Sequence, residues 1–176
     1  MGNFKMLAEV FRYPYSGQLE VLREGLETVG DPRLRAALKT FLERMRTQSL
    51  DEREMLFTRT FDLNPVAAPY LGWHIWGEDF KRAAFMARLQ QEQRKWGVSA
   101  EGELPDHLVP VFEYLEAADP PGEEVLQVLV PALSEMKNEL QKQDPENPYL
   151  PVLAAALRVA EAFVQERLQK KEEELR

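Results

Sequence analysis

The chain has 176 residues, of which 44% are hydrophobic and 30% are charged, a composition typical of one folded domain with a real core. It contains no cysteine, which excludes disulfide bonds, iron–sulfur clusters and thiolate metal sites. The net charge of −8 argues against a nucleic-acid partner, and no stretch approaches the roughly 18 uncharged apolar residues that a membrane span needs.

The first residues predict a short helix and give no sign of a secretory signal. Glu9 and Arg12 interrupt the apolar residues that follow Lys5, so no apolar signal segment forms. We therefore expect a cytoplasmic protein.

Apolar residues recur at three- and four-residue spacing along most of the chain, which predicts helices with one buried face. Asp31 followed by Pro32 predicts a helix start, and Ser49 with Glu52 is a capping-box signature. No alternating run or hairpin signal predicts a strand. Helices are expected over about residues 6–11, 18–29, 32–45, 50–61, 79–96, 125–140 and 152–168, with one more that starts at Asp106.

The expected fold is an all-α, single-domain bundle of roughly eight helices that covers residues 1–176. Pro131 predicts a kink in its helix or a later start. The charged tail, about residues 169–176, is expected to fray into solvent.

The excess negative charge is concentrated in one segment. Residues 96–136 contain no Lys or Arg, and the rest of the chain is nearly neutral, with 21 acids and 22 bases. Such a segment would attract a basic partner, although a solubilising acidic face would look the same. The segment holds nine acids: Glu101, Glu103, Asp106, Glu113, Glu116, Asp119, Glu123, Glu124 and Glu135.

The sequence offers little for catalysis. The two histidines, His74 and His107, form no metal-binding pair, and no glycine-rich phosphate loop or nucleophile elbow is present. We therefore predict no catalytic residue and no metal site, and we do not expect an enzyme.

Two clusters are candidates for binding. Residues 70–79 contain two of the three tryptophans together with a tyrosine and a histidine, which favours a groove wall, although each ring alone could be core packing. In residues 103–108, Asp106 is expected to cap the next helix after Pro105, and a carboxylate near the His107 imidazole would favour its charged form. The candidate peptide-binding residues are Tyr70, Trp73, His74, Trp76, Glu103, Pro105, Asp106, His107 and Tyr114.

Several of these residues follow one another in an order that resembles a known family. Phe57-x-x-x-Phe61-Asp62 precedes the 70–79 cluster and Arg82-Ala83, and then come Glu-Leu-Pro-Asp-His-Leu-x-Pro at 103–110 and Glu-Tyr-Leu at 113–115. Over about residues 50–118 the chain resembles the molybdoenzyme assembly chaperones, and more closely their nitrate reductase delta subunit branch. The related trimethylamine N-oxide and dimethyl sulfoxide reductase chaperones usually have a residue between the proline and the aspartate, which are adjacent here.

The resemblance implies a helical chaperone that binds the N-terminal leader, often of the twin-arginine type, of a molybdopterin oxidoreductase catalytic subunit. It would assist cofactor insertion before export or membrane docking. The client would carry the molybdenum cofactor, and the chaperone would hold none permanently. Asp106 and His107 match the positions of peptide recognition in this family, and Glu103 and Pro105 complete that motif.

A leader of this type has a basic patch followed by an apolar stretch. Acids of residues 101–124 would meet the arginines, and rings near Tyr70, Trp76 and Tyr114 would take the apolar stretch. The alternative is a general helical adaptor for another basic partner, which would show no preference for twin-arginine peptides. The client, its leader sequence and the choice between a monomer and a homodimer stay open.

Overall fold

The computed structural model describes residues 1–64 and 67–176. These residues form nine α-helices and no β-strand, which confirms the predicted all-α class. A 3-10 turn, Leu26–Thr28, and a π-helical turn, Thr58–Asp62, follow two of the helices. The helices are α1 (Asn3–Val10), α2 (Gln18–Gly25), α3 (Pro32–Met45), α4 (Leu50–Phe57), α5 (Leu71–Trp76), α6 (Phe80–Lys95), α7 (Leu108–Ala117), α8 (Glu123–Gln143) and α9 (Leu150–Glu174).

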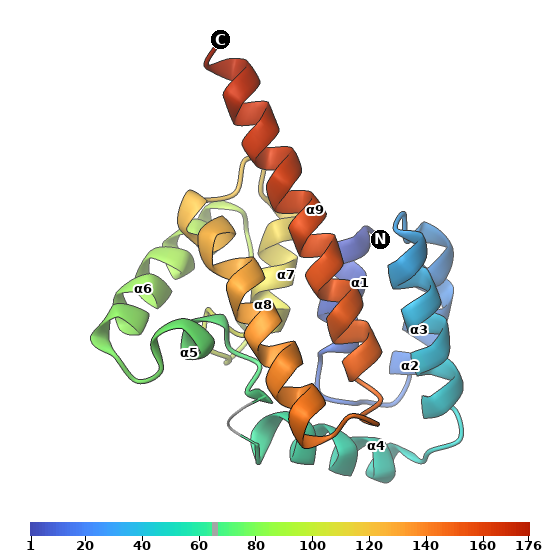
Figure 1. Ribbon diagram of the computed structural model, residues 1–176. Coiled ribbons are helices and arrows are strands. Elements are labelled where there is room, and N and C mark those ends of the chain that lie inside the picture. The colour runs from blue at the N-terminus through green and yellow to red at the C-terminus, as the bar shows by residue number, and fades with distance from the viewer. Residues whose placement is uncertain (65–66) are drawn as a thin grey trace.

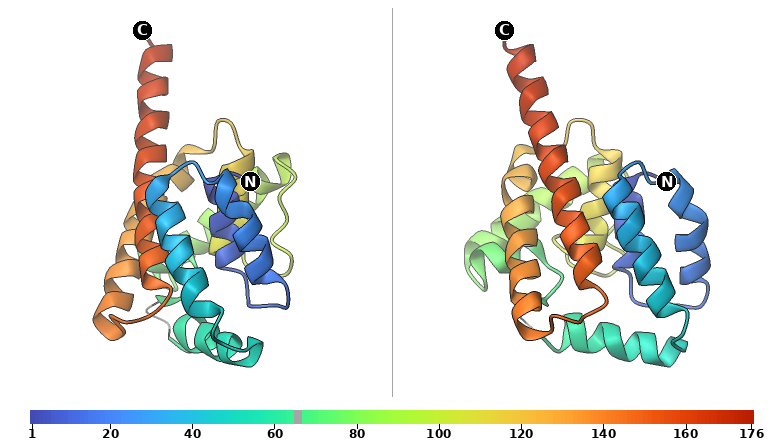
Figure 2. Two further views of the ribbon diagram at one scale, coloured as in Figure 1. Left: turned by 90° about the vertical axis from the view of Figure 1, so that its right-hand side faces the viewer. Right: turned by 45° about the vertical axis from the view of Figure 1, so that its right-hand side comes forward.

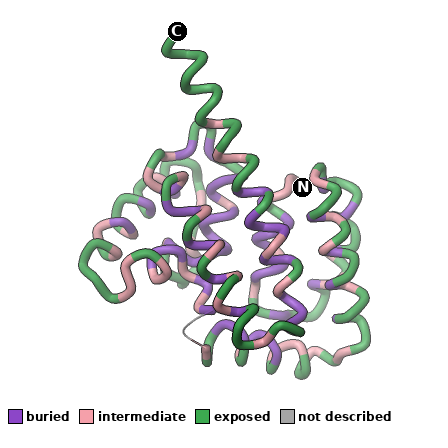
Figure 3. Tube along the Cα trace, in the orientation of Figure 1, coloured by how far each residue is buried: buried purple, intermediate pink, exposed green. Residues whose placement is uncertain are grey.

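The long helices pack side by side, and α4 crosses their lower ends (Figure 1). α7 lies along α1, α8 lies along α9, and α3 packs on the other side of α9. Figure 2 shows from two further sides that α4 runs across the base of this bundle. The buried residues are concentrated where α1, α7, α8 and α9 meet (Figure 3).

A run of aromatic rings fixes the π-helical turn against the core. The Phe61 ring lies 5.9 Å from Phe11, directly after α1, and 4.9 Å from Tyr149, directly before α9, centroid to centroid. The buried Asn147 side chain donates to Thr60 Oγ1 (2.9 Å) and accepts from the Tyr149 amide (2.9 Å). Because both ring packing and a buried hydrogen bond hold this turn, the direction of the residue that ends it, Asp62, is well defined.

The predicted helix starts are confirmed at three positions. Asp31 accepts from the amides of Arg33 and Leu34, and Asp79 accepts from the amide of Lys81. Ser49 and Glu52 exchange both hydrogen bonds of a capping box.

Three elements differ from the prediction. Residues 71–76 form a helix, α5, that the spacing of apolar residues did not indicate. α8 starts at Glu123 and continues through Pro131; this proline is exposed, so water can satisfy the carbonyl that loses its amide partner. α9 continues through the charged tail, where Lys170 pairs with Glu166 one turn earlier (2.9 Å), and its end projects beyond the other helices (Figure 1).

No helix within residues 1–64 and 67–176 combines the length and the apolar character that a membrane crossing requires.

Candidate functional site

The two clusters singled out in the sequence are joined directly by backbone hydrogen bonds. The Leu71 amide donates to the Asp106 carbonyl (2.8 Å), and the Leu108 amide donates to the Pro69 carbonyl (2.9 Å). These bonds form an isolated antiparallel bridge between Tyr70 and His107. The start of α5 and the start of α7 are therefore joined directly, although more than 30 residues separate them.

Asp106 holds this junction together from inside. Its side chain is 0% exposed. Oδ2 accepts from the Gly72 amide (3.0 Å) and from Arg82 Nε (2.9 Å), and Oδ1 accepts from Arg82 Nη2 (3.2 Å). The expectation that Asp106 caps its own helix is wrong: its carboxylate caps α5 instead, because the bridge turns it toward the Gly72 amide.

His107 is the residue that caps α7. Its Nδ1 accepts from the Val109 amide (3.1 Å), which only an unprotonated Nδ1 can do. Burial lowers the pKa of His107, and this outweighs the raising effect of Glu103 and Asp106. The expectation of a charged imidazole is therefore wrong, since desolvation exceeds the attraction to the carboxylates.

Other predicted residues face the protein rather than a cavity. The Trp76 ring packs 5.1 Å from Phe85, centroid to centroid, and Trp73 lies beside the Arg82 guanidinium (6.0 Å from carbon Cζ to the ring centroid). His74 Nε2 donates to the Ala68 carbonyl (2.7 Å), and burial lowers the pKa of this histidine. These contacts attach α5 to α6 and to the segment before α5.

Pro105 and Tyr114 are likewise held within the fold. The Pro105 carbonyl accepts from the buried Gln93 side chain of α6 (2.8 Å). The fully buried Tyr114 hydroxyl accepts from the Gly122 amide (2.8 Å) and so fixes the start of α8.

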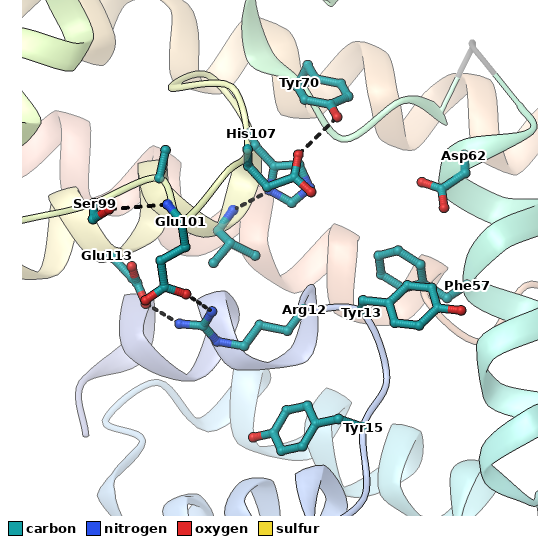
Figure 4. A pocket seen from close by; sticks show the side chains of 13 residues that line it. Arg12, Tyr13, Tyr15, Phe57, Asp62, Tyr70, Ser99, Glu101, His107 and Glu113 are labelled. Carbon is teal, nitrogen blue, oxygen red and sulfur yellow. Dashed lines mark hydrogen bonds and ion pairs between the residues drawn. The ribbon is translucent and has the colours of Figure 1, made fainter.

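A cavity of about 530 Å³ opens where the end of α1, the π-helical turn, the 97–106 loop and the start of α7 meet (Figure 4). Three predicted residues, Tyr70, Glu103 and His107, line it. Figure 4 shows Asp62 on the opposite wall and Tyr13 and Tyr15 on the segment that follows α1. We call this space the acidic cavity; its other charged residues are Arg12, Asp62, Glu101 and Glu113.

Arg12 neutralises one side of the acidic cavity. It pairs with Glu9 (3.2 Å), with Glu101 (3.7 Å) and with Glu113. Glu101 belongs to the 97–106 loop, so the guanidinium also ties this loop to the end of α1.

The other side keeps uncompensated negative charge. Among the described residues, neither Asp62 nor Glu103 forms an ion pair. Burial, and then the charge of Glu103, raise the pKa of Asp62. The Tyr70 hydroxyl donates to Glu103 (3.2 Å), and burial together with this carboxylate raises the pKa of Tyr70 to about 12. Two carboxylates beside aromatic rings form a receptor for a cation, and best for a planar guanidinium.

The negative charge of residues 96–136 is more compensated than its composition indicates. Six of its nine acids form ion pairs with Lys or Arg residues from outside the segment, so much of this charge is balanced within the fold. The pairs are Glu101 and Glu113 with Arg12, Asp106 with Arg82, Glu124 with Arg88, Asp119 with Arg167, and Glu123 with Lys171.

The predicted site residues did not include Asp62, Arg12, Tyr13 and Tyr15. A signal was present for the first, because Asp62 ends the Phe-x-x-x-Phe-Asp motif. Arg12 and Tyr13 lie near the N-terminus and far from the recognised motifs, so only the packing of α1 on α7 shows their place. Within the described ranges, no three His, Asp or Glu side chains are grouped in a way that could hold a metal ion.

Comparison with known proteins identifies the family. The family described as nitrate reductase delta subunit matches residues 29–170, which is more than half of the chain. A search of curated proteins found no match. The matched range includes Asp62, the Tyr70–His107 bridge and Glu103. The chain belongs to the nitrate reductase delta subunit family, whose members are chaperones rather than enzymes and bind the nitrate reductase catalytic subunit during molybdoenzyme assembly.

Proposed function

We propose that this protein is a cytoplasmic chaperone that binds a twin-arginine type leader at the N-terminus of a molybdopterin oxidoreductase catalytic subunit. The leader would stay bound while the molybdenum cofactor, carried by the client, is inserted before export or membrane docking. The single observation that supports leader binding is the acidic cavity, in which Asp62 and Glu103 have no cationic partner in the described chain.

The cavity fits a basic peptide in both charge and shape. Each carboxylate can accept two hydrogen bonds from one guanidinium, so the two acids suit two neighbouring arginines. The rings of Tyr13 and Tyr15, 52% and 39% exposed, can take the flat faces of these groups. An exposed charge pair contributes only about 0.2–1 kcal/mol, so apolar contacts must supply much of the affinity.

The candidate residues then divide into two groups. Tyr70, Glu103 and His107 line the cavity and would touch the peptide. The remaining residues would act by holding the wall in position rather than by direct contact; these are Trp73, His74, Trp76, Pro105, Asp106 and Tyr114.

Titration calorimetry with a synthetic twin-arginine leader peptide tests the proposal. The double variant Asp62→Asn with Glu103→Gln should bind about tenfold more weakly, because two charge-assisted contacts are lost. The control is Glu20→Gln with Glu161→Gln, which removes the same charge from two exposed acids outside the cavity. Equal affinity of the two double variants would count against the acidic cavity as the leader site.

The alternative, a general adaptor for basic partners, is tested with a second peptide. This peptide has the same composition but its arginines are separated and scrambled. A leader chaperone should bind the native order several-fold more tightly, whereas an adaptor should bind both peptides alike.

A further inference from the structure

A second groove adjoins the acidic cavity at the side chain of Tyr13. This groove, about 450 Å³ in volume, lies on the outer face of α4 and the π-helical turn. Tyr13, Met55 and Leu63 provide its apolar lining, and its polar lining consists of Asp51, Glu54, Thr58 and Arg59. Tyr13 lines both spaces, so the two adjoin at this side chain; we call the second one the α4 groove.

The lining of the α4 groove is unusually exposed for large apolar side chains. Met55 is 67% exposed, Leu63 is 75% exposed and Tyr13 is 52% exposed. The outer face of a surface helix normally carries polar residues, whereas here large apolar side chains lie together around one depression. Tyr13 is held in place by the Phe57 ring, 5.4 Å away and at 76°, so the floor that joins the two spaces is already formed.

The π-helical turn explains why the two kinds of surface adjoin. The Leu63 amide donates to the Thr58 carbonyl (2.9 Å), five residues earlier, so this turn is wider than an α-helical one. Two successive residues are thereby directed into different spaces: Asp62 lines the acidic cavity and Leu63 lines the α4 groove. Asp62 thus lies on one side of Tyr13, and the exposed apolar side chains of Met55 and Leu63 lie on the other.

We propose that the α4 groove binds the apolar stretch that follows the arginines of the leader, which sets the direction of the bound peptide. The arginines lie in the acidic cavity, and the chain then crosses Tyr13 toward Met55 and Leu63. This inference rests on the proposed leader binding. Charge complementarity fixes the basic end, and the position of Tyr13, which lines both spaces, places the apolar end on α4.

The affinity test compares two charge-matched double variants. The probe is a synthetic peptide with two adjacent arginines followed by an apolar stretch, and binding is measured by calorimetry. Met55→Asp with Leu63→Asp should weaken binding at least about tenfold, because both apolar contacts are replaced by charges. The control is Leu168→Asp with Leu175→Asp, a leucine of α9 and the leucine directly after it, 56% and 79% exposed, and it should bind like the unchanged protein.

A second probe isolates the apolar contact. It keeps the two arginines but has serines in place of the apolar stretch. The unchanged protein and the Met55→Asp, Leu63→Asp variant should bind this probe equally, because it leaves the α4 groove empty. Thermal unfolding of both double variants checks the fold, and Met55→Ser with Leu63→Ser replaces the aspartate variant if that one unfolds.

The direction of the peptide can be tested by disulfide trapping, because the chain has no cysteine of its own. Ser99→Cys places a thiol at the acidic cavity and Met55→Cys places one at the α4 groove. A peptide with cysteine beside its arginines should be trapped by the first variant, and a peptide with cysteine after its apolar stretch by the second. The reverse pattern would overturn the proposed direction.

These outcomes separate the groove from the proposed function. If Asp62→Asn with Glu103→Gln weakens binding while Met55→Asp with Leu63→Asp matches its control, the groove inference is overturned and leader binding at the acidic cavity stands. If the unchanged protein binds neither probe, the proposed function fails, and the groove inference fails with it.

Discussion

Glu103 and Asp106 are three residues apart in one motif, yet their surroundings are opposite. Asp106 is fully buried and accepts hydrogen bonds from Gly72 and Arg82. Glu103 is exposed, accepts from the Tyr70 hydroxyl and has no cation beside it in the described chain. The bridge between Tyr70 and His107 accounts for the difference. Glu103 comes before the bridge and lines the acidic cavity, whereas Asp106, whose carbonyl accepts one of the bridge hydrogen bonds, directs its side chain into the protein.

The same chemical group, a carboxylate, thus serves two purposes within one loop. A buried carboxylate is tolerated only when it is paired, and it then fixes the geometry around it. An exposed and unpaired carboxylate adds nothing to the fold, but it remains available to a ligand. Asp106, which the family resemblance placed at the position of peptide recognition, is therefore the acid that a peptide cannot reach.

Replacing each carboxylate in turn by alanine tests whether Asp106 and Glu103 differ in their contribution to stability, and it should give the largest effect. Asp106→Ala should lower the free energy of unfolding by about 3–5 kcal/mol, because it leaves Arg82 buried without its partner and the Gly72 amide without an acceptor. Glu103→Ala should change it by less than about 0.5 kcal/mol. Urea denaturation measures both, and similar effects at the two positions would remove the distinction.

A double variant sharpens this result. Asp106→Ala combined with Arg82→Ala leaves no unpaired charge, so its loss of stability should be smaller than the sum of the two single losses. Strict additivity would mean that the hydrogen bonds between Arg82 and Asp106 contribute little to the stability of the junction.

The fold followed from the sequence more fully than the site did. Capping signals at Asp31, Ser49 and Asp79 are local, so neighbouring residues were enough to predict them. The capping partner of Asp106 is the Gly72 amide, 34 residues away, and the spacing of neighbouring residues cannot predict such a long-range hydrogen bond. The same applies to the acidic cavity, where α1 brings Arg12 and Tyr13 beside residues of the 97–106 loop.

His107 directly follows Asp106 and lines the acidic cavity together with Glu103, and its titration can be tested by pH. Burial lowers its pKa below the ordinary 6.5, so the folded protein keeps it neutral while the unfolded chain binds a proton. Stability should therefore fall as the pH drops below about 6.5, by at most about 1.4 kcal/mol per pH unit for each such histidine. His74, whose pKa is also lowered by burial, contributes in the same direction.

The variant His107→Asn isolates the contribution of this residue. Asparagine can still cap α7, but it does not titrate. Between pH 7.5 and 5.5, the urea midpoint of the variant should fall less than that of the unchanged protein. An equal fall in both proteins would show that the His107 imidazole gains a proton in the folded state as easily as in the unfolded chain.

The smallest expected effect concerns Asp62, the second unpaired acid. Its pKa is raised in the folded protein by burial and by Glu103, so its charged form is less favourable there than in the unfolded chain. Near neutral pH this disfavours folding, and Asp62→Asn should raise the free energy of unfolding by at most a few tenths of a kcal/mol, since the group is largely exposed to solvent. Asp51→Asn, in the first turn of α4, is the matched control and should change it slightly in the opposite direction, because an acid there stabilises the helix N-terminus. If Asp62 is retained for its ligand, Asp62→Asn should stabilise the fold and weaken leader binding at the same time. A loss of stability instead would place Asp62 with Asp106 among the residues that hold the structure.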